Sequence, residues 1–375
     1  MGTSATVIVI GAGPAALAAA NHLGTVPGLD VVVVSPGGSS DFLAGTLPVA
    51  TGDAEVSDYR VPVAIDGVRV IDARAGAIRP ATGTSGPAVL INGDWLEAQS
   101  VIAAPGLAVA EIGAAPNLYG FWGLDGASEA RSSVTSFDGG TLTVAIASGV
   151  YRCPPAPYGL AMRLAERVRS LGLTAQVRLT TPEDRPLAAI GTSVSDYLRR
   201  ACDEAGIEVR YGFALNPDAL NEGVLADVSG EVLDTDLGLV VPPHYKNLLL
   251  QDAASTGPLV EVDEFGRTSI DGVFAAGDAV ARPFPRASAP ADVSGLIAAR
   301  GVLHTLGLAD EPLEILPEPD CFVDRGSGQY SRIQITYPDG VPPSAEPYVT
   351  ISDPRHETHA AFTEARRTWM SMCGS

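Results

Sequence analysis

The fold of this chain is decided near its N-terminus by the stretch VIVIGAGPAAL, residues 7–17. β-branched residues end at Gly11 and give way to an alanine-rich segment, which predicts a strand, a tight turn and a helix. The turn has the spacing G-x-G-x-x-A, a Rossmann dinucleotide-binding fingerprint with alanine in the third position. Gly11 permits the turn, Gly13 lets a pyrophosphate approach the backbone, and Ala16 lets the helix pack closely. We therefore predict that a dinucleotide binds at this turn.

The helix after this turn begins with Pro14 and Ala15. Proline suits a first helical turn because its missing N–H costs no hydrogen bond there. The free N–H groups and the positive end of the helix dipole face the phosphates. The next strand, residues 31–34, ends at Ser35 instead of the acidic residue that would hold the adenosine ribose. We expect Ser35 to give a weaker contact, unless Asp41 in the following loop replaces the carboxylate.

Composition bounds the class of protein. The chain has 375 residues, which exceeds one hydrophobic core and predicts two or three domains. The net charge of -20 repels nucleic acid and anionic lipid, so neither is an expected partner. No basic leader and no apolar stretch long enough for a membrane span is visible, so a cytoplasmic location is expected. The spacing of the four cysteines fits no zinc pattern and the histidines are scattered, so we expect no metal.

A second motif lies far along the chain, TSIDGVFAAGDA at residues 268–279. It resembles the flavin motif of the FAD-dependent pyridine nucleotide–disulfide oxidoreductase superfamily, which implies that Gly277 and Asp278 bind the ribitol and pyrophosphate side of FAD. A third stretch, VIAAPG at residues 101–106, resembles the crossover out of the FAD domain in this superfamily. That likeness adds further candidate cofactor-binding residues: Ala104, Pro105 and Gly106. The three motifs bracket an inserted second domain.

The inserted segment starts a second strand–turn–helix unit. Residues 141–147 read as a strand, and a helix with apolar residues at helical spacing follows at 160–171. The turn between them, SGVYRCPPAPY at residues 148–158, has one glycine and three prolines. Proline has no backbone N–H, so this turn cannot cradle a pyrophosphate, and tight NAD(P)H binding is not expected.

The same turn offers a thiol. Cys153 follows a strand and precedes a helix, a location that lowers a cysteine pKa and favours the thiolate. Arg152 adds a positive charge beside it. The alternative is a buried structural cysteine in a turn made rigid by proline, and the residues alone leave both interpretations open.

The element YRCPPAPY at residues 151–158 resembles one found in sulfide:quinone oxidoreductases and in the flavoprotein subunit of flavocytochrome c sulfide dehydrogenase. The resemblance implies that Cys153 is one half of a redox disulfide beside FAD, which sulfide attacks. The segment PDCFV at residues 319–323 is similar to the region of the family's second cysteine, which implies Cys321 as the other half. Electrons would then pass to FAD and on to a quinone or another acceptor.

The chain departs from this family in several ways. Gly159 replaces a glutamate, and no cysteine near residues 41–48 would tether the flavin, so FAD should be bound noncovalently. A third cysteine found in many quinone-linked members is absent between residues 106 and 140. The C-terminal residues 359–370 predict one short helix, so we expect at most peripheral membrane contact. Trp369 is expected to pack against the flavin domain.

The sequence therefore predicts an α/β fold with two Rossmann-like, three-layer domains and a small C-terminal α+β unit. The predicted units are an FAD domain at 1–105 and 236–310, an inserted domain at 106–235 with Cys153, and a C-terminal domain at 311–375 with Cys321. We expect Cys202 to lie on a helix and to pack that helix against its neighbours, and we expect Cys373 to be a loose thiol. The oligomeric state cannot be predicted from the residues.

The resemblance favours an FAD-dependent oxidoreductase that oxidises sulfide or a related small sulfur nucleophile through persulfide formation. Three alternatives stay open. One is a biosynthetic flavoprotein that uses the same cysteines for sulfur transfer or dithiol oxidation. Another is an enzyme like type II NADH dehydrogenase, which shares the fold. The third is a non-enzymatic flavin-dependent interaction protein.

Overall fold

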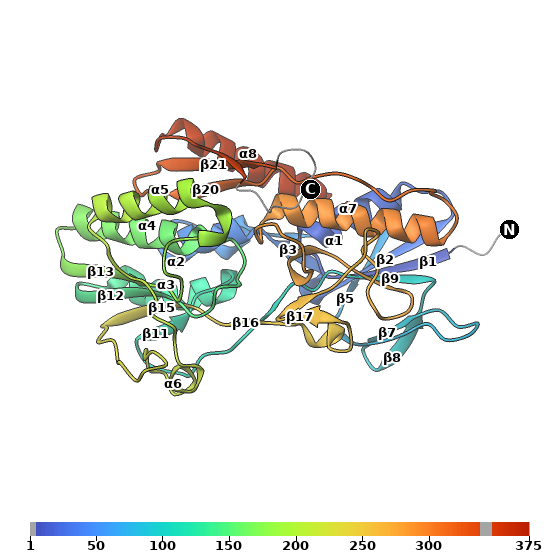
Figure 1. Cartoon of the computed structure of the whole chain (residues 1–375), viewed down its shortest axis with the longest axis horizontal. Coiled ribbons are helices and arrows are strands. Elements are labelled where there is room, and N and C mark those ends of the chain that lie inside the picture. Colours follow the sequence, from blue (N-terminus) through green and yellow to red (C-terminus); the bar gives the residue numbers. More distant parts are fainter. Residues whose placement is uncertain (1–4, 338–346, 375) are drawn as a thin grey trace.

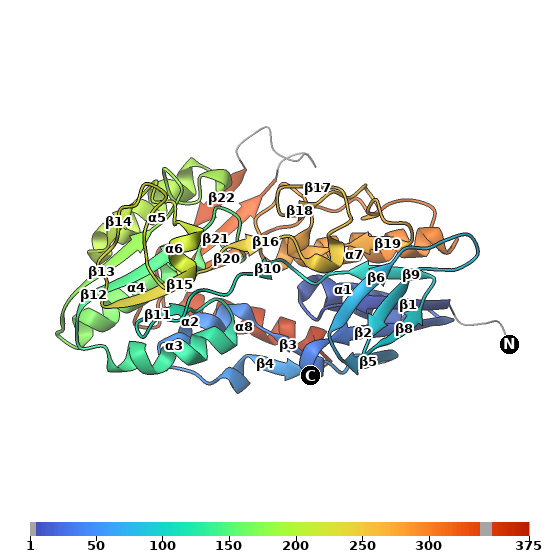
Figure 2. The same cartoon turned by 90° about the horizontal axis from the view of Figure 1, so that it is seen from below.

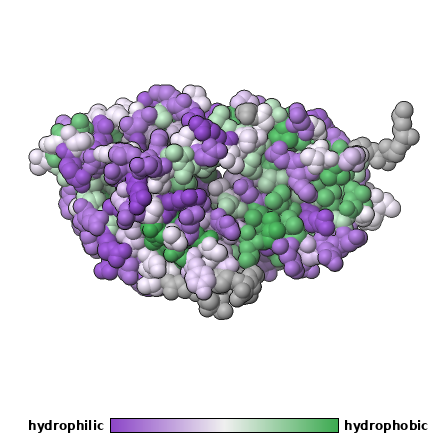
Figure 3. Space-filling model, turned by 90° about the horizontal axis from the view of Figure 1, so that it is seen from above, coloured by the Kyte–Doolittle hydropathy of each residue, from purple (hydrophilic) through white to green (hydrophobic). Residues whose placement is uncertain are grey.

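The computed structural model describes residues 5–337 and 347–374. Its framework is two five-stranded parallel sheets, one in each half of the elongated molecule, joined near the middle (Figure 1). Seen from above, the surface over the second sheet is largely hydrophilic, whereas a broader apolar area lies over the first-sheet half (Figure 3). No helix in the described ranges has the length and apolar character needed to cross a membrane.

The first sheet has the strand order β19-β9-β1-β2-β5, all parallel. Its strands are β1 (Ala5–Ile10), β2 (Leu29–Ser35), β5 (Val68–Asp72), β9 (Ser100–Ala103) and β19 (Val273–Ala275). Both faces are covered, as parallel sheets require. Val7 and Val9 pack under the helices α1 (Pro14–Gly24) and α7 (Ser288–Thr305), while Ile8 and Ile10 face an antiparallel sheet. That sheet consists of β6 (Ala75–Arg79), β7 (Ala88–Ile91) and β8 (Asp94–Glu97).

The second sheet has the order β11-β15-β12-β13-β14, also all parallel. Its strands are β11 (Leu118–Gly120), β12 (Gly139–Ile146), β13 (Thr174–Thr180), β14 (Glu208–Arg210) and β15 (Leu237–Val241). Three helices share its core, namely α3 (Leu124–Ser136), α4 (Ala156–Ser170) and α5 (Thr192–Ala205). The predicted strand–turn–helix unit is confirmed as β12 and α4, although Leu171 lies beyond α4 and is exposed.

One predicted boundary is wrong. We predicted that residues from 236 onward belong to the FAD domain, but β15 pairs with β11 and β12 in the second sheet. A continuous apolar run such as Leu237–Val241 fits either parallel sheet, so periodicity could not decide between them. The chain crosses between the sheets at two short strands that pair antiparallel, β10 (Ala108–Val109) and β16 (His244–Tyr245) (Figure 2).

The C-terminal segment forms an antiparallel sheet and a helix. The strands are β20 (Asp320–Asp324), β21 (Tyr330–Thr336) and β22 (Tyr348–Ile351), and the helix is α8 (Glu357–Met372). α8 lies against α1, above the first sheet (Figure 1). β20 packs against α4, so this segment spans both halves of the molecule.

The end of α8 is fastened to the first-sheet half. Trp369 is 5% exposed and its Nε1 donates a hydrogen bond to Ser40 Oγ at 3.0 Å, which confirms the predicted packing against the flavin-binding region. The Cys373 carbonyl accepts a hydrogen bond from the Ala64 amide at 2.8 Å. The Cys373 side chain is fully buried, so the prediction of a loose thiol is wrong. Cys202 is fully buried in α5, as predicted.

Candidate functional site

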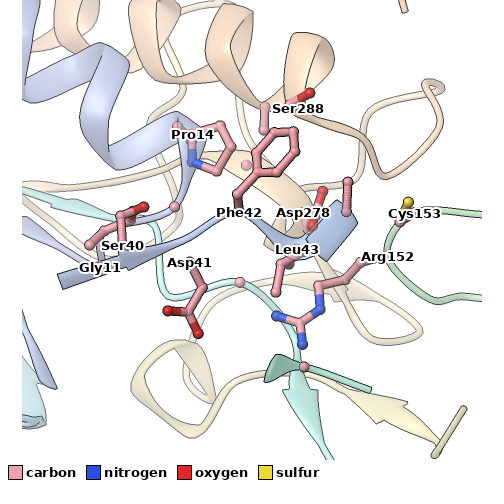
Figure 4. Close-up of a pocket in the computed structure, with 18 of the residues that line it drawn as sticks. Gly11, Pro14, Ser40, Asp41, Phe42, Leu43, Arg152, Cys153, Asp278 and Ser288 are labelled. Carbon is pink, nitrogen blue, oxygen red and sulfur yellow. The ribbon is translucent and has the colours of Figure 1, made fainter. Parts of the chain in front are cut away.

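A large cavity of about 1400 Å³ lies where the two halves and the C-terminal segment meet. Ligand pockets for drug-sized molecules span roughly 300–1,000 Å³, so this cavity has room for a dinucleotide. The fingerprint residues line one side of it, and Arg152 and Cys153 enter from another (Figure 4).

The fingerprint turn has the geometry that the sequence predicts. Gly11 has a φ of +110°, and a Cβ at this position would lie 2.3 Å from the Ala104 carbonyl oxygen. A Cβ on Gly13 would meet no atom within 4 Å, so its backbone is open toward the cavity. Since α1 begins at Pro14, its free N–H groups face the space where a pyrophosphate would lie.

Most of the predicted cofactor residues line this cavity: Gly11, Gly13, Pro14, Ala15, Ser35, Ala104, Pro105, Gly106, Gly277 and Asp278. Ala16, from the same fingerprint, does not line the cavity. It is 1% exposed and packs in the core beneath α1. Its smallness serves the close approach of helix and strand, which is what the third position of the fingerprint requires.

The adenosine side has no free carboxylate at the expected place. Ser35 ends β2 and lines the cavity, while the neighbouring Asp72 of β5 accepts a hydrogen bond from the Gly37 amide at 2.6 Å. Asp41 also lines the cavity, but Arg60 donates two hydrogen bonds to its carboxylate, at 2.7 and 2.8 Å. Both carboxylates therefore already stabilise the loops around the site.

Asp278 lies in a short turn, Gly277–Ala279, between β19 and α7. Burial raises the pKa of its carboxyl, and the positive charges of Arg152 and Arg286 oppose that shift. The Gly277 amide donates to Ser294 Oγ at 3.1 Å, which fixes the turn on α7. Asp278 is thus a buried acceptor at the cavity wall, the kind of group that binds ribitol hydroxyls.

Arg152 gives the cavity a positive charge. Its Nε is buried and has no hydrogen-bond partner in the described part of the chain, and burial lowers its pKa. The charges of Asp278 and Asp41 offset part of the cost of this burial, and an anion bound in the cavity would offset more of it. The backbone of the fingerprint turn, Asp278 and Arg152 together fit an anionic dinucleotide with polar hydroxyls, which is the chemistry of FAD.

The two cysteines of the predicted pair line this same cavity as free thiols. Cys153 sits in the turn before α4 with a φ of +51°, and its amide donates to the Arg286 carbonyl at 2.7 Å. Cys321 comes from β20 and is 8% exposed. Burial raises the Cys321 pKa, and the charge of Cys153 raises it further.

The expectation of a thiolate at Cys153 is wrong for this structure. Burial raises its pKa to about 11 and Asp278 adds to the shift. The Ala156 amide and Arg152 oppose it without overcoming it. The prolines on either side of Ala156 leave few N–H groups at this helix start, so the usual stabilisation of a thiolate there is small.

Sequence reasoning missed two features of the cavity. One is Asp292, which lies in the second turn of α7 and lines the cavity. Its Oδ1 is buried and has no hydrogen-bond partner among the described residues, and burial raises the pKa of its carboxyl to about 7. The other feature is a group of aromatic side chains on the cavity wall, namely Phe42, Phe322, Tyr330, Phe362 and Trp369. Only tertiary packing brings these aromatic residues together, so no local sequence pattern predicts the group.

The chain is similar in sequence to several known proteins. Residues 159–295 match the family model described as pyridine nucleotide-disulphide oxidoreductase. The ferredoxin–NAD(+) reductase component of the p-cumate 2,3-dioxygenase system of Pseudomonas putida is 32% identical over 118 residues, 30% of this chain and 28% of that protein. Rhodocoxin reductase of Rhodococcus erythropolis is 31% identical over 180 residues, 45% of this chain and 38% of that protein. The chain thus spans well under half the length of either relative.

Solved structures share the whole fold. The sulfide:quinone oxidoreductase of Aquifex aeolicus superposes with a TM-score of 0.81 at 17% identity, covering 98% of this chain and 91% of that one. The NADH:rubredoxin oxidoreductase of Clostridium acetobutylicum gives 0.59 at 18% identity, covering 91% and 84%.

The fold has two Rossmann-like cores, as the sequence predicts, and its cofactor is FAD. Over residues 159–295 the chain is similar to the pyridine nucleotide-disulphide oxidoreductase family.

Proposed function

We propose that this protein is an FAD-dependent oxidoreductase that oxidises sulfide or a related sulfur nucleophile through a Cys153–Cys321 pair. One observation carries the proposal: both thiols line the cavity that also contains the dinucleotide turn and Asp278. A cysteine pair that opens onto a flavin cavity is suited to exchange electrons, whereas a structural pair would be expected inside a core.

The residues that would hold FAD are those whose geometry fits it. The amides at the start of α1 would meet the pyrophosphate across Gly13, and Asp278 would accept from ribitol hydroxyls. When bound, FAD supplies a two-electron acceptor next to the dithiol. The absence of a nearby cysteine in residues 41–48 supports noncovalent binding.

The thiol chemistry is a disulfide exchange. In the oxidised pair, a hydrosulfide ion attacks one of the two sulfurs and the Cys153–Cys321 bond breaks. A new sulfur–sulfur bond forms on the attacked cysteine, which becomes a persulfide, and the other cysteine leaves as a thiolate. Arg152 lies close enough to Cys153 to stabilise a negative charge there and to attract an anionic nucleophile. Transfer of the persulfide's outer sulfur to a second hydrosulfide would leave two thiols, whose two electrons would pass to the bound flavin and then to a quinone or another acceptor as the disulfide re-forms.

The turn before α4 argues against a nicotinamide nucleotide as the electron donor. The Ala156 amide, at the start of the helix, already donates to the Cys153 carbonyl at 3.0 Å. Pro154, Pro155 and Pro157 have no amide hydrogen to offer. Few backbone donors are therefore left at this helix start for a second pyrophosphate.

An anaerobic visible titration of the purified flavoprotein tests the proposal. Sulfide should bleach the oxidised flavin spectrum stoichiometrically, and NADH added separately should not. Bleaching by NADH alone would favour a reductase of the type named in the comparisons. Bleaching by neither reagent would rule out both donors and leave thiol transfer or dithiol oxidation on another metabolite.

A further inference from the structure

Cys153 lies in the turn before α4 and Cys321 in β20, and α4 and β20 touch at their backbones. A Cβ added to Gly159 of α4 would lie 3.1 Å from the Asp324 amide nitrogen of β20. Farther along, a Cβ on Gly326 would lie 2.5 Å from the Glu166 Cβ. The glycine that replaces the family's glutamate at 159 thus allows the strand to approach the helix closely.

Arg163 lies on the same face of α4, one turn after Gly159, and its side chain is only 16% exposed. Its Nη1 forms an ion pair with the Asp324 carboxylate. Its Nε donates to Thr51 Oγ1 at 2.8 Å and its Nη2 to Asp53 Oδ2 at 2.7 Å. One guanidinium therefore joins α4, β20 and the loop after α2 (Thr46–Ala50).

Asp324 depends on this contact. Its side chain is 2% exposed, and its other oxygen accepts a hydrogen bond from the Gly326 amide at 2.8 Å. A buried carboxylate that loses its cation is strongly destabilised, so β20 would have to move to rehydrate it. Cys321 is in the same strand and would move with it.

We propose that Arg163 is a positioning residue that holds Cys321 within bonding reach of Cys153. The inference rests on the proposed function, because it concerns the same cysteine pair. A disulfide forms only in a narrow range of Cα–Cα separations, roughly 4.4–6.8 Å, so a small shift of β20 weakens it. Arg163 contributes to the stability of the disulfide without contacting either sulfur.

The test is the dithiol–disulfide equilibrium of the full-length holoprotein in thiol redox buffers, read by alkylation of free thiols and peptide mapping. Arg163→Gln should make the Cys153–Cys321 disulfide at least about tenfold less stable, a rise in potential of about 30 mV. Arg163→Lys keeps one charged contact, so its disulfide potential should lie between that of Arg163→Gln and that of the wild type. The matched control is Arg178→Gln, because Arg178 is 14% exposed and pairs with Glu208 inside the second sheet, away from β20. This variant should keep the wild-type potential.

A folded Arg163→Gln protein with the wild-type potential would overturn the proposal. If that variant does not fold, Asp53→Asn removes one arm while the Asp324 pair stays, and it should shift the potential less but in the same direction. No shift in folded Asp53→Asn and Arg163→Lys would overturn the proposal equally. A wild-type protein that never forms the Cys153–Cys321 disulfide would instead contradict the proposed function.

Discussion

The thiols of Cys153 and Cys321 line the same cavity, although one belongs to the turn before α4 and the other to a strand near the C-terminus. They line one cavity because β20 packs along α4, and the fingerprint turn lies in the same cavity because α8 fastens the C-terminal segment to the first-sheet half. The C-terminal unit therefore completes the cavity and supplies one of its two thiols.

Cys153 should react slowly with alkylating reagents at neutral pH. Burial raises the pKa of its thiol to about 11, so the reactive thiolate accumulates only as the pH rises toward that value. The rate of Cys153 carbamidomethylation in the reduced protein, followed by peptide mass spectrometry, should keep rising above pH 9. A rate that levels off near pH 8, where an ordinary cysteine of pKa about 8.5 titrates, would contradict this.

Two glycine substitutions should separate folding from cofactor binding. Gly13→Ala places a methyl group in open space in the cavity, so the protein should fold normally but lose FAD affinity by tenfold or more, an effect of about 1.4 kcal/mol. Gly11→Ala forces a Cβ against the Ala104 carbonyl at a φ that only glycine favours, so it should also lower the unfolding free energy by about 1–3 kcal/mol. FAD titration and urea unfolding measure both. Equal stability of the two variants would refute the assigned roles.

Asp292 should make stability fall as the pH rises. Its pKa is raised in the folded protein to about 7, so ionisation is disfavoured there, and folding loses free energy between the ordinary pKa near 4 and pH 7. The Asp292→Asn variant lacks this loss. Its free energy of unfolding should exceed that of the wild type by up to about 4 kcal/mol at pH 8 and by little at pH 4. Urea unfolding at both pH values provides the measurement. A difference that does not change with pH would exclude a buried, uncompensated carboxyl.

Trp369 should be important to stability because it joins α8 to the loop that contains Ser40. Trp369→Ala removes a buried indole and its hydrogen bond, and should lower the free energy of unfolding by about 3–5 kcal/mol. Trp95→Ala offers a matched control, since Trp95 is 43% exposed in β8, and it should cost less than about 1 kcal/mol. Equal losses in the two variants would show that α8 packing contributes nothing special.

The sequence was most informative where a local pattern has one physical meaning. The glycines of the first turn need a positive φ or an open approach, and their spacing predicted the strand, the helix start at Pro14 and the cofactor site. The prolines after Cys153 likewise predicted a turn without phosphate donors. These features depend on residues close together in the chain, so propensity and sterics suffice.

Long-range features escaped prediction. The sheet of β15, the burial of Cys373, the neutral Cys153 thiol and the unpaired carboxyl of Asp292 all depend on what packs around them. The pKa of Cys153 illustrates this. The start of a helix lowers a cysteine pKa, but burial raises it by more. The pairing of Cys153 with Cys321 came from a family resemblance, and no spacing in this chain would have identified the partner.

The central claim is that both cysteines are needed to pass electrons from a sulfur nucleophile to the flavin. The most direct measurement is the rate of anaerobic flavin bleaching by sulfide in the wild type, Cys153→Ser and Cys321→Ser, with Cys202→Ser as a control for a buried cysteine outside the cavity. The account predicts that each cavity variant binds FAD normally and loses at least about 10²-fold in bleaching rate, while Cys202→Ser bleaches like the wild type. Bleaching at the wild-type rate in both cavity variants would contradict the account.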